Sequence, residues 1–355
     1  MTEMIKRDFK RSRWLFILIV LGGGLFLTMC ISATIGAVKI PLSVILRMLL
    51  ARFPVVGKKL SPPLYPASFE TIFFYIRLPR IWQGAVVGAA LALAGVVLQG
   101  LLRNPLADPF VLGVSSGAAL GASVAIILGL GAGFLGNFTI PLSAFIGALL
   151  TVVAVYFLAQ MGGRLKIETL LLSGVVVGSF LSSLVLFLMS LFRKKLPDVM
   201  FWLMGNLAPS NISLLKSVTL FLVAGILVIY LFSRDLNAFA LGEESARHLG
   251  VEVEMIKKLL FVATSLVTGV AVAISGLIGF VGLMIPHMVR MVVGPDHRIL
   301  IPSSALAGAI FLIIADTIAR TVIAPTELPV GVVTAIFGAP FFVYLLRRSR
   351  KPESG

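Results

Sequence analysis

Apolar stretches of about 20 residues recur from one end of the chain to the other, and this feature limits the possible folds more than any other. A helix of that length crosses a lipid bilayer. Of the 355 residues, 59% are hydrophobic and 13% are charged, whereas soluble domains carry about 45–50% apolar and about 25% charged residues. The sequence therefore predicts an all-α, polytopic membrane protein, without a polar region long enough for a separate soluble domain.

The apolar pattern predicts about ten transmembrane helices in a single domain that covers residues 1–355. An even number of spans places both termini on the same side of the membrane, and the distribution of Lys and Arg between the loops favours the cytoplasm. The net charge of +15 comes from basic residues at span ends, which indicates contact with membrane lipid and not with nucleic acid. The expected spans are residues 14–36, 80–102, 110–131, 139–160, 168–191, 212–232, 257–278, 282–294, 301–323 and 330–346.

The sequence also contains an internal repeat. A shift of 181 residues aligns "GAALALAGVV" with "GVAVAISGLI", so that Gly88 matches Gly269 and Pro105 matches Pro286. The copies begin five crossings apart, at the second and seventh spans, and an odd number of crossings means that they enter the membrane from opposite faces. Spans 2–5 repeated as spans 7–10 would form the inverted repeat that many transporters build around a central pathway. The eighth span is short and contains Pro286, and such interrupted segments point toward the pathway.

Enzyme chemistry finds little support in the sequence. The chain has no HExxH motif, no Gly-x-Ser-x-Gly on a strand-turn-helix and a single cysteine, and its three histidines are far apart, so we expect no catalytic residues and no metal site. The segment "VGKK" at 56–59 lacks the spacing and the Ser or Thr of a phosphate-binding loop. We therefore expect a chain that binds no cofactor and does not hydrolyse ATP by itself.

Two charged features allow more than one interpretation. Asp316 and Arg320 lie four residues apart, which fits a structural ion pair, and an ion-coupled carrier would be expected to hold more acidic residues in the membrane. The charged segment 233–258 predicts two short helices separated by Gly250. It is either a solvated connection or a docking element for a partner on the cytoplasmic side.

Several long motifs follow one another along the chain in the order of a known family. They are "RLPRIWQGAVVGAALALAGVVLQGLLRNPLADPFVLGVSSGA", "FWLMGNL", "ALGEESARHLGV", "SGLIGFVGLMIPHMVRMVVGPDHR" and "ELPVGVVTAIFGAPFFVYLL". The chain resembles the permease subunits of ABC importers for iron-siderophore, haem and cobalamin, the FecCD type. This resemblance implies a type II importer permease in a bacterial or archaeal cytoplasmic membrane. It further implies a homodimer or a pair of related subunits, two cytoplasmic ATPase subunits that use ATP, and a periplasmic or lipid-anchored binding protein.

The resemblance also assigns roles to individual residues. Basic residues at the outer mouth would dock acidic residues of the binding protein, and by position these are Arg77, Arg80 and Arg320. For the first two, anchoring at the lipid interface is the alternative, and the third has Asp316 as a competing partner. The segment 240–250 is similar to the coupling helices that contact the ATPases, with matches at Gly242, Glu243, Ala246, Leu249 and Gly250.

A pathway and a gate are expected between these two ends. Small residues such as Gly88 and Gly95 either pack helices together or line the pathway. By position, Leu106, Ile167 and Glu168 would form a cytoplasmic gate.

The expected function is ATP-driven import of a metal chelate. Ferric siderophore is the leading candidate, with haem and cobalamin as the others. The alternative is a secondary transporter or channel with an inverted repeat and no ATPase partner.

Overall fold

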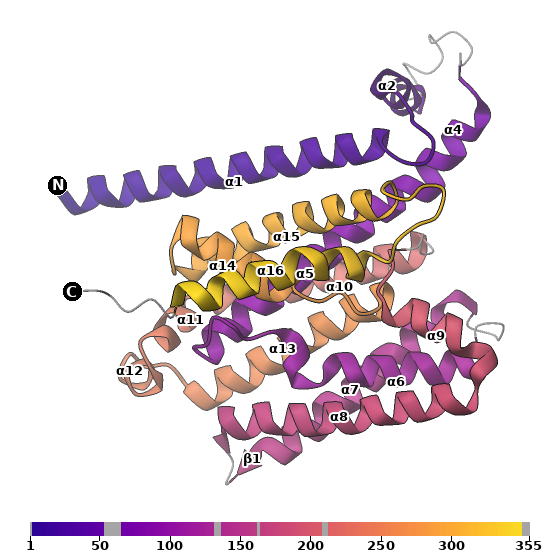
Figure 1. Ribbon diagram of the computed structural model, residues 1–355. Coiled ribbons are helices and arrows are strands. Elements are labelled where there is room, and N and C mark those ends of the chain that lie inside the picture. The colour runs from indigo at the N-terminus through magenta and orange to yellow at the C-terminus, as the bar shows by residue number, and fades with distance from the viewer. Residues whose placement is uncertain (1, 53–64, 131–135, 162–163, 208–211, 350–355) are drawn as a thin grey trace.

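The computed structural model describes residues 2–52, 65–130, 136–161, 164–207 and 212–349, which form a bundle of helices (Figure 1). Seven of the helices are long and apolar enough to cross a membrane, and shorter apolar helices cover 42–51, 114–127, 281–293 and 330–344. Two-residue strands, β1 and β2, pair antiparallel between α7 and α8. The helices are α1 (Thr2–Thr34), α2 (Leu42–Ala51), α4 (Ala67–Thr71), α5 (Leu78–Leu101), α6 (Val114–Ile127), α7 (Thr139–Ala159), α8 (Ile167–Leu191), α9 (Leu196–Leu203), α10 (Ile212–Leu231), α11 (Ser233–Ala240), α12 (Glu243–His248), α13 (Val253–Ser275), α14 (Val281–Val293), α15 (His297–Ala319) and α16 (Val330–Ser349). The shorter elements are the π-helical turn η1 (Ile72–Arg77), the 3-10 turns η2 (Pro109–Leu112), η4 (Gly136–Phe138) and η5 (Arg193–Lys195), and the strands β1 (Gln160–Met161) and β2 (Arg164–Leu165).

Each of the ten predicted spans contains a helix, so the predicted all-helical membrane fold is confirmed. The third span differs most, because its first residues form the turn η2 and the helix α6 starts only at Val114. Asp108 accepts a hydrogen bond from the backbone of Phe110 and stabilises that turn. Gly113 ends it with φ +77°, a left-handed conformation that favours glycine. The helix α2, between the first two spans, was not predicted.

The helix α5 is the centre of the bundle. Every residue from Ala90 to Leu101 is buried, because α13, α14 and α15 surround it. The backbones of α5 and α15 touch at Gly88 and Gly308, where a Cβ atom on either residue would overlap the carbonyl group of the other. Gly95 lies in the same way against the backbone of Gly282 in α14. The structure thus places Gly88 and Gly95 in helix–helix contacts, and neither faces an open pathway within this chain.

The opposed directions of the two halves are visible where α5 meets α13. Gln83, near the start of α5, donates a hydrogen bond of 2.7 Å to the carbonyl of Ile274, near the end of α13. The packing between the two halves is also reciprocal. The first helix of each repeat contacts the third helix of the other, since α5 contacts α15 and α13 contacts α7. The first helix of one repeat, α5, therefore runs antiparallel to the first helix of the other repeat, α13, as an inverted repeat requires.

Residues that the shift of 181 aligns do not occupy equivalent positions in the two halves of the structure. The predicted partner of Gly95 is Gly276, which lies beyond the end of α13 with φ +66°, whereas Gly95 is inside α5. Pro105 lies in a turn, and its predicted partner Pro286 lies inside α14. The repeat is a repeat of topology, and the helix ends have shifted within it.

The contact between α5 and α15 predicts a large effect from a single methyl group. We expect Gly88→Ala to lower the free energy of unfolding by about 1–3 kcal/mol, because its Cβ would meet the backbone of Gly308. The matched control is Gly23→Ala in α1, where a Cβ meets no atom within 4 Å. That control is expected to be neutral or stabilising. Thermal unfolding in detergent measures both, and equal effects would contradict the packing role.

Candidate functional site

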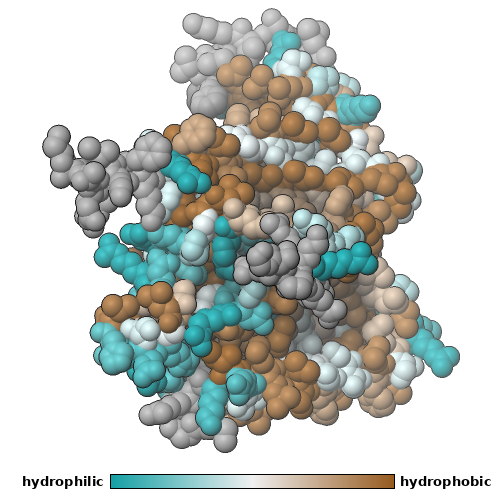
Figure 2. All heavy atoms as spheres, turned by 60° about the vertical axis from the view of Figure 1, so that its left-hand side comes forward, coloured by the Kyte–Doolittle hydropathy of each residue, from teal (hydrophilic) through white to brown (hydrophobic). Residues whose placement is uncertain are grey.

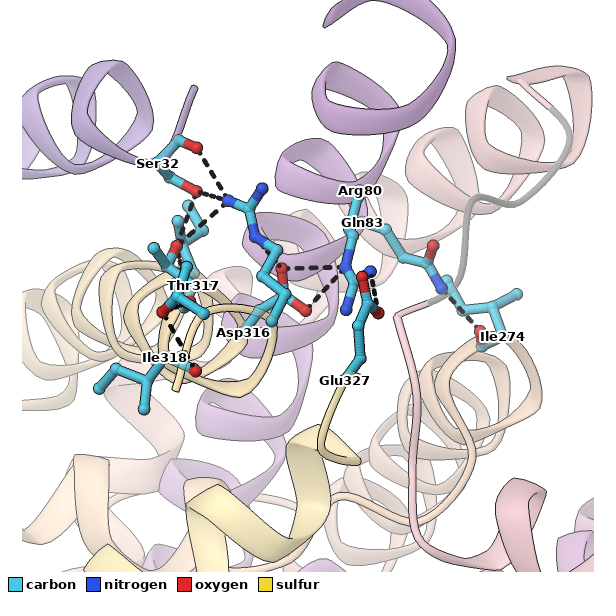
Figure 3. A network of polar contacts seen from close by, with 11 residues as sticks. Ser32, Arg80, Gln83, Ile274, Asp316, Thr317, Ile318 and Glu327 are labelled. Atoms are coloured by element: carbon cyan, nitrogen blue, oxygen red, sulfur yellow. Dashed lines mark hydrogen bonds and ion pairs between the residues drawn. The ribbon is translucent and has the colours of Figure 1, made fainter. Parts of the chain in front are cut away.

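One end of the bundle carries a cluster of charges, the charge cluster, made of the buried Arg77, Arg80, Asp316 and Arg320 and the half-exposed Glu327. Figure 3 shows how Arg80, Asp316 and Glu327 lie in it. Arg80, in the first turn of α5, donates from Nε to both carboxylate oxygens of Asp316 at 2.9 and 3.1 Å. Its Nη1 donates to Oε2 of Glu327 at 2.7 Å. One guanidinium therefore joins α5, α15 and the connection between α15 and α16.

Arg320 extends the cluster to α1. Its Nη2 donates to the carbonyl of Ser32 at 2.8 Å and to the Ser32 hydroxyl at 2.6 Å. The hydroxyls of Ser32 and Thr317 are 2.8 Å apart, which adds a second polar contact between the two helices. Nε of Arg320 lies 3.5 Å from a carboxylate oxygen of Asp316. Asp316 is thus a buried carboxylate between two guanidinium groups.

Arg77, at the end of η1, holds the chain just after α1. Its Nη1 donates to the carbonyl of Ala33 at 2.8 Å, and its Nη2 donates to the carbonyl of Val38. Gly36 provides the room for this guanidinium, since a Cβ at that position would lie 2.6 Å from Nη2. Backbone carbonyls therefore satisfy this arginine in place of a carboxylate.

The three arginine side chains of the charge cluster are buried and form no exposed surface. Arg77, Arg80 and Arg320 are 3%, 5% and 6% exposed, respectively, and all of them bond to groups within the chain. The side chain of Glu327 is 48% exposed and is the accessible part of the cluster. The structure therefore does not present the arginines for direct contact with a partner, nor as anchors in the lipid interface. Their predicted docking role stays a prediction, and any such role passes through the groups that cover them.

At the other end of the bundle, α11 and α12 form a small projection (Figure 1). Leu236 and Phe239 bury the apolar face of α11, and Ala246 of α12 is completely buried. Gly242 and Gly250 bracket α12 with φ +111° and +83°, conformations that require glycine for practical purposes. These contacts give the segment 240–250 a fixed shape.

The outer face of this projection is exposed. Leu241 and Leu249 are 66% and 63% exposed, although large apolar side chains gain from burial. Glu243 is tied back to α13 by an ion pair of 2.6 Å with Lys257, whose side chain is buried. Figure 2 brings this side of the molecule forward and shows hydrophilic and hydrophobic residues next to one another on it. An exposed leucine pair beside charged groups is typical of a protein-binding surface.

A polar junction, which the sequence pattern did not predict, attaches α11 to the first turn of α15. Oδ1 of Asn237 accepts a hydrogen bond of 2.8 Å from the backbone of His297 and lies 2.8 Å from Nδ1 of that residue. Nδ2 of Asn237 donates to Asp296 at 3.0 Å, and Asp296 caps α15 by accepting from the backbone of Arg298. The opposite ring nitrogen of His297 faces Gly100 in α5. His297 is therefore a structural residue, which only its capping neighbour Asp296 hints at in the sequence.

The predicted gate residues lie at two separate places in the fold. Leu106 is 38% exposed in the turn after α5. Ile167 is half-buried and Glu168 is exposed, both in the first turn of α8. In the same turn as Leu106, burial raises the pKa of Asp108 to about 6, so this carboxyl titrates close to neutral pH. The gate itself stays a prediction.

The charge cluster predicts a strong dependence on the Arg80–Asp316 pair. We expect Arg80→Ala to lower the free energy of unfolding by about 3–5 kcal/mol, because it leaves a buried carboxylate without its main partner. The double variant with Asp316→Ala is expected to recover part of this loss. Lys195→Ala, which breaks an exposed pair with Asp198, is the control and should change it by about 0–1 kcal/mol. Thermal unfolding in detergent provides the measurement, and equal losses in both single variants would refute the assignment.

Comparisons with known proteins agree with this architecture. The FecCD transport family matches residues 24–348. The chain is 47% identical over 282 residues to the cobalamin import system permease BtuC of Halobacterium salinarum, covering 79% of this chain and 75% of that one. It is 40% identical over 286 residues to the hemin transport system permease HmuU of Yersinia pestis, covering 80% and 85%. It is also 44% identical over 284 residues to the ABC transporter permease YvrB of Bacillus subtilis, covering 80% of each.

Solved structures show the same fold. An inward-facing ABC transporter of the metal-chelate type superposes with a TM-score of 0.79 and 33% identity, covering 94% of this chain and 99% of that chain. PsaBC of Streptococcus pneumoniae superposes with a TM-score of 0.52 at 18% identity, covering 78% and 92%, which supports the fold alone. The match of one family over nearly the whole chain, with relatives above 40% identity, means that this chain belongs to the FecCD transport family and is the permease subunit of an ABC importer.

Proposed function

We propose that this permease subunit couples ATP hydrolysis by two separate ATPase subunits to the import of a metal chelate, and that the segment 240–250 is its ATPase contact. The observation that supports this most directly is the exposed pair Leu241 and Leu249 on a projection of fixed shape. Gly242, Glu243, Ala246 and Gly250 serve that shape, and Leu249 makes the contact.

The junction at Asn237 gives the ATPase contact a route into the bundle. A displacement of α12 reaches α11, and Asn237 passes it to the first turn of α15 through three hydrogen-bonding contacts. The 23 residues of α15 span about 34 Å and end at the charge cluster. The same helix therefore links the surface that would bind the ATPase to the opposite end of the bundle.

The pathway requires a second permease subunit, either another copy of this chain or a related one. Serines at 179, 182, 183 and 190 are exposed along α8, on the same helix face as Glu168. Polar side chains on a membrane helix usually face a water-filled path or a protein contact instead of lipid. We place the pathway along this face of α8, with Ile167 and Glu168 at one end. That end would lie next to the turn that holds Leu106, either in this chain or in the second permease subunit.

The binding protein would dock at the end of the charge cluster. Glu327 and the neighbouring loop are exposed there, and Arg77, Arg80 and Arg320 hold the ends of α1, α5 and α15 in position beneath them. Figure 1 shows the start of α1 and the end of α16 on the side of α11 and α12. The proposal therefore puts both termini in the cytoplasm and the charge cluster on the outer side of the cytoplasmic membrane.

The cargo is proposed from the relatives alone. Their names specify cobalamin and hemin, and the structural neighbour is of the metal-chelate type. A ferric siderophore, haem or cobalamin is thus the proposed class, with ferric siderophore first. The chelated metal is cargo, and the chain itself would hold no cofactor.

The proposal is tested by transport in liposomes. The permease reconstituted with its ATPase and binding protein should accumulate the chelate only with ATP present, and the chain alone should not. Uptake against a gradient by the chain alone would instead establish the secondary transporter. The contact on 240–250 disfavours that alternative, because a secondary transporter needs no ATPase.

Two variants separate the ATPase contact from the transmission of its movement. Leu249→Asp should abolish co-purification of the ATPase, because a charge replaces an exposed apolar contact. Asn237→Leu should keep co-purification but lower the chelate transported per ATP roughly tenfold, since the junction to α15 loses its hydrogen bonds. Thermal unfolding checks that both variants are folded. Normal transport per ATP in Asn237→Leu would remove the junction from the mechanism.

A further inference from the structure

An apolar slot lies beneath the middle of α1. It has a volume of about 670 Å³ and is lined by side chains of α1, α14, α15 and α16, among them Phe16, Val20, Met288, Ile310 and Phe341. Nearly all of the surface that it exposes is apolar. Such a lining fits hydrocarbon and leaves a buried water molecule without hydrogen-bond partners.

The slot exists because α1 is attached to the bundle at two points and packs loosely between them. Ser32 holds one end through Thr317 and Arg320. At the other end, Nη2 of Arg13 donates to the carbonyl of Val292 at 3.4 Å. In between, on the face of α1 that lines the slot, a Cβ at Gly24 would meet only Cδ1 of Ile310, at 3.6 Å. A flexible chain enters such a space more readily than a second helix, which is about 10 Å across.

Positive charge gathers at the Arg13 end of the slot. Arg13 is exposed and has no carboxylate partner among the side chains that the structure describes. The guanidinium of Arg298 lies 5.2 Å from the centre of the Trp14 ring, although Asp296 balances its charge. Trp and Arg together are typical of the level of lipid headgroups. This end of the slot therefore matches an anionic headgroup.

We propose that the slot is a binding site for one acyl chain of an anionic phospholipid whose phosphate contacts Arg13. Phe16 to Leu21 of the lining follow Arg13 by three to eight residues, which places them about 4–12 Å deeper in the membrane. Ile310 and Ile314 of α15 line the slot as well, so that the tail has apolar contacts on both sides. The lipid thus fills the space that α1 leaves open. This inference is independent of the cargo and of the ATPase.

The tail site is tested by filling it. Native mass spectrometry of the full chain, purified in mild detergent and mixed with phosphatidylglycerol, should show one bound phospholipid. Val20→Trp, whose side chain enters the slot, should lose it. Ile19→Trp is the matched control, since the neighbouring Ile19 is 62% exposed and does not line the slot. Equal retention of lipid by both variants would overturn the site. Loss of a dimer in Val20→Trp, with no lipid in the parent, would overturn it in favour of a second copy of the chain.

The headgroup site is tested by charge. Arg13→Ala should weaken binding of phosphatidylglycerol about fivefold, whereas Arg11→Ala, on the opposite side of α1, should leave it unchanged. Phosphatidylcholine, which has no net charge, should bind the parent about fivefold more weakly than phosphatidylglycerol. Equal binding of the two lipids, or equal effects of the two variants, would refute the assignment of an anionic headgroup to Arg13.

Discussion

The ion pair between Arg80 and Asp316 is the contact on which most of this structure depends. A carboxylate that is 2% exposed is stable only with a partner, and Arg80 supplies it with two hydrogen bonds. The same guanidinium holds Glu327, and Arg320 carries the network on to α1. Helices from both halves of the chain thus meet at one group of charges, although lipid offers little hydrophobic drive for helix association.

Close backbone contacts between helices add to the stability that the charge cluster provides. Gly88 against Gly308 and Gly95 against Gly282 bring α5 within reach of α15 and α14. Dispersion between such closely packed helices then supplies stability that the hydrophobic effect cannot supply in lipid. The small-residue run in α5 is therefore explained by packing at the centre of the bundle.

The sequence was sufficient to predict the fold, but it predicted few of the contacts between side chains. Apolar length located a helix in each of the ten predicted spans, and seven of these helices are long enough to cross a membrane. The pattern missed the junction at Asn237, since hydrogen bonds between distant segments leave no periodic signal. The resemblance predicted that Arg77, Arg80 and Arg320 dock a binding protein, whereas all three side chains are buried, because a motif does not reveal which carbonyl or carboxylate lies opposite a charge. Asp316 was correctly paired with Arg320, but Arg80 is its closer partner.

The position of Gly308 in α15 has a mechanical consequence. The residue lies halfway along the helix, in backbone contact with Gly88, while Asn237 holds the first turn and Arg80 the last. A stiff helix that is in contact with its neighbour near its midpoint can tilt about that contact. Any tilt of α15 about this contact would displace its two ends in opposite directions.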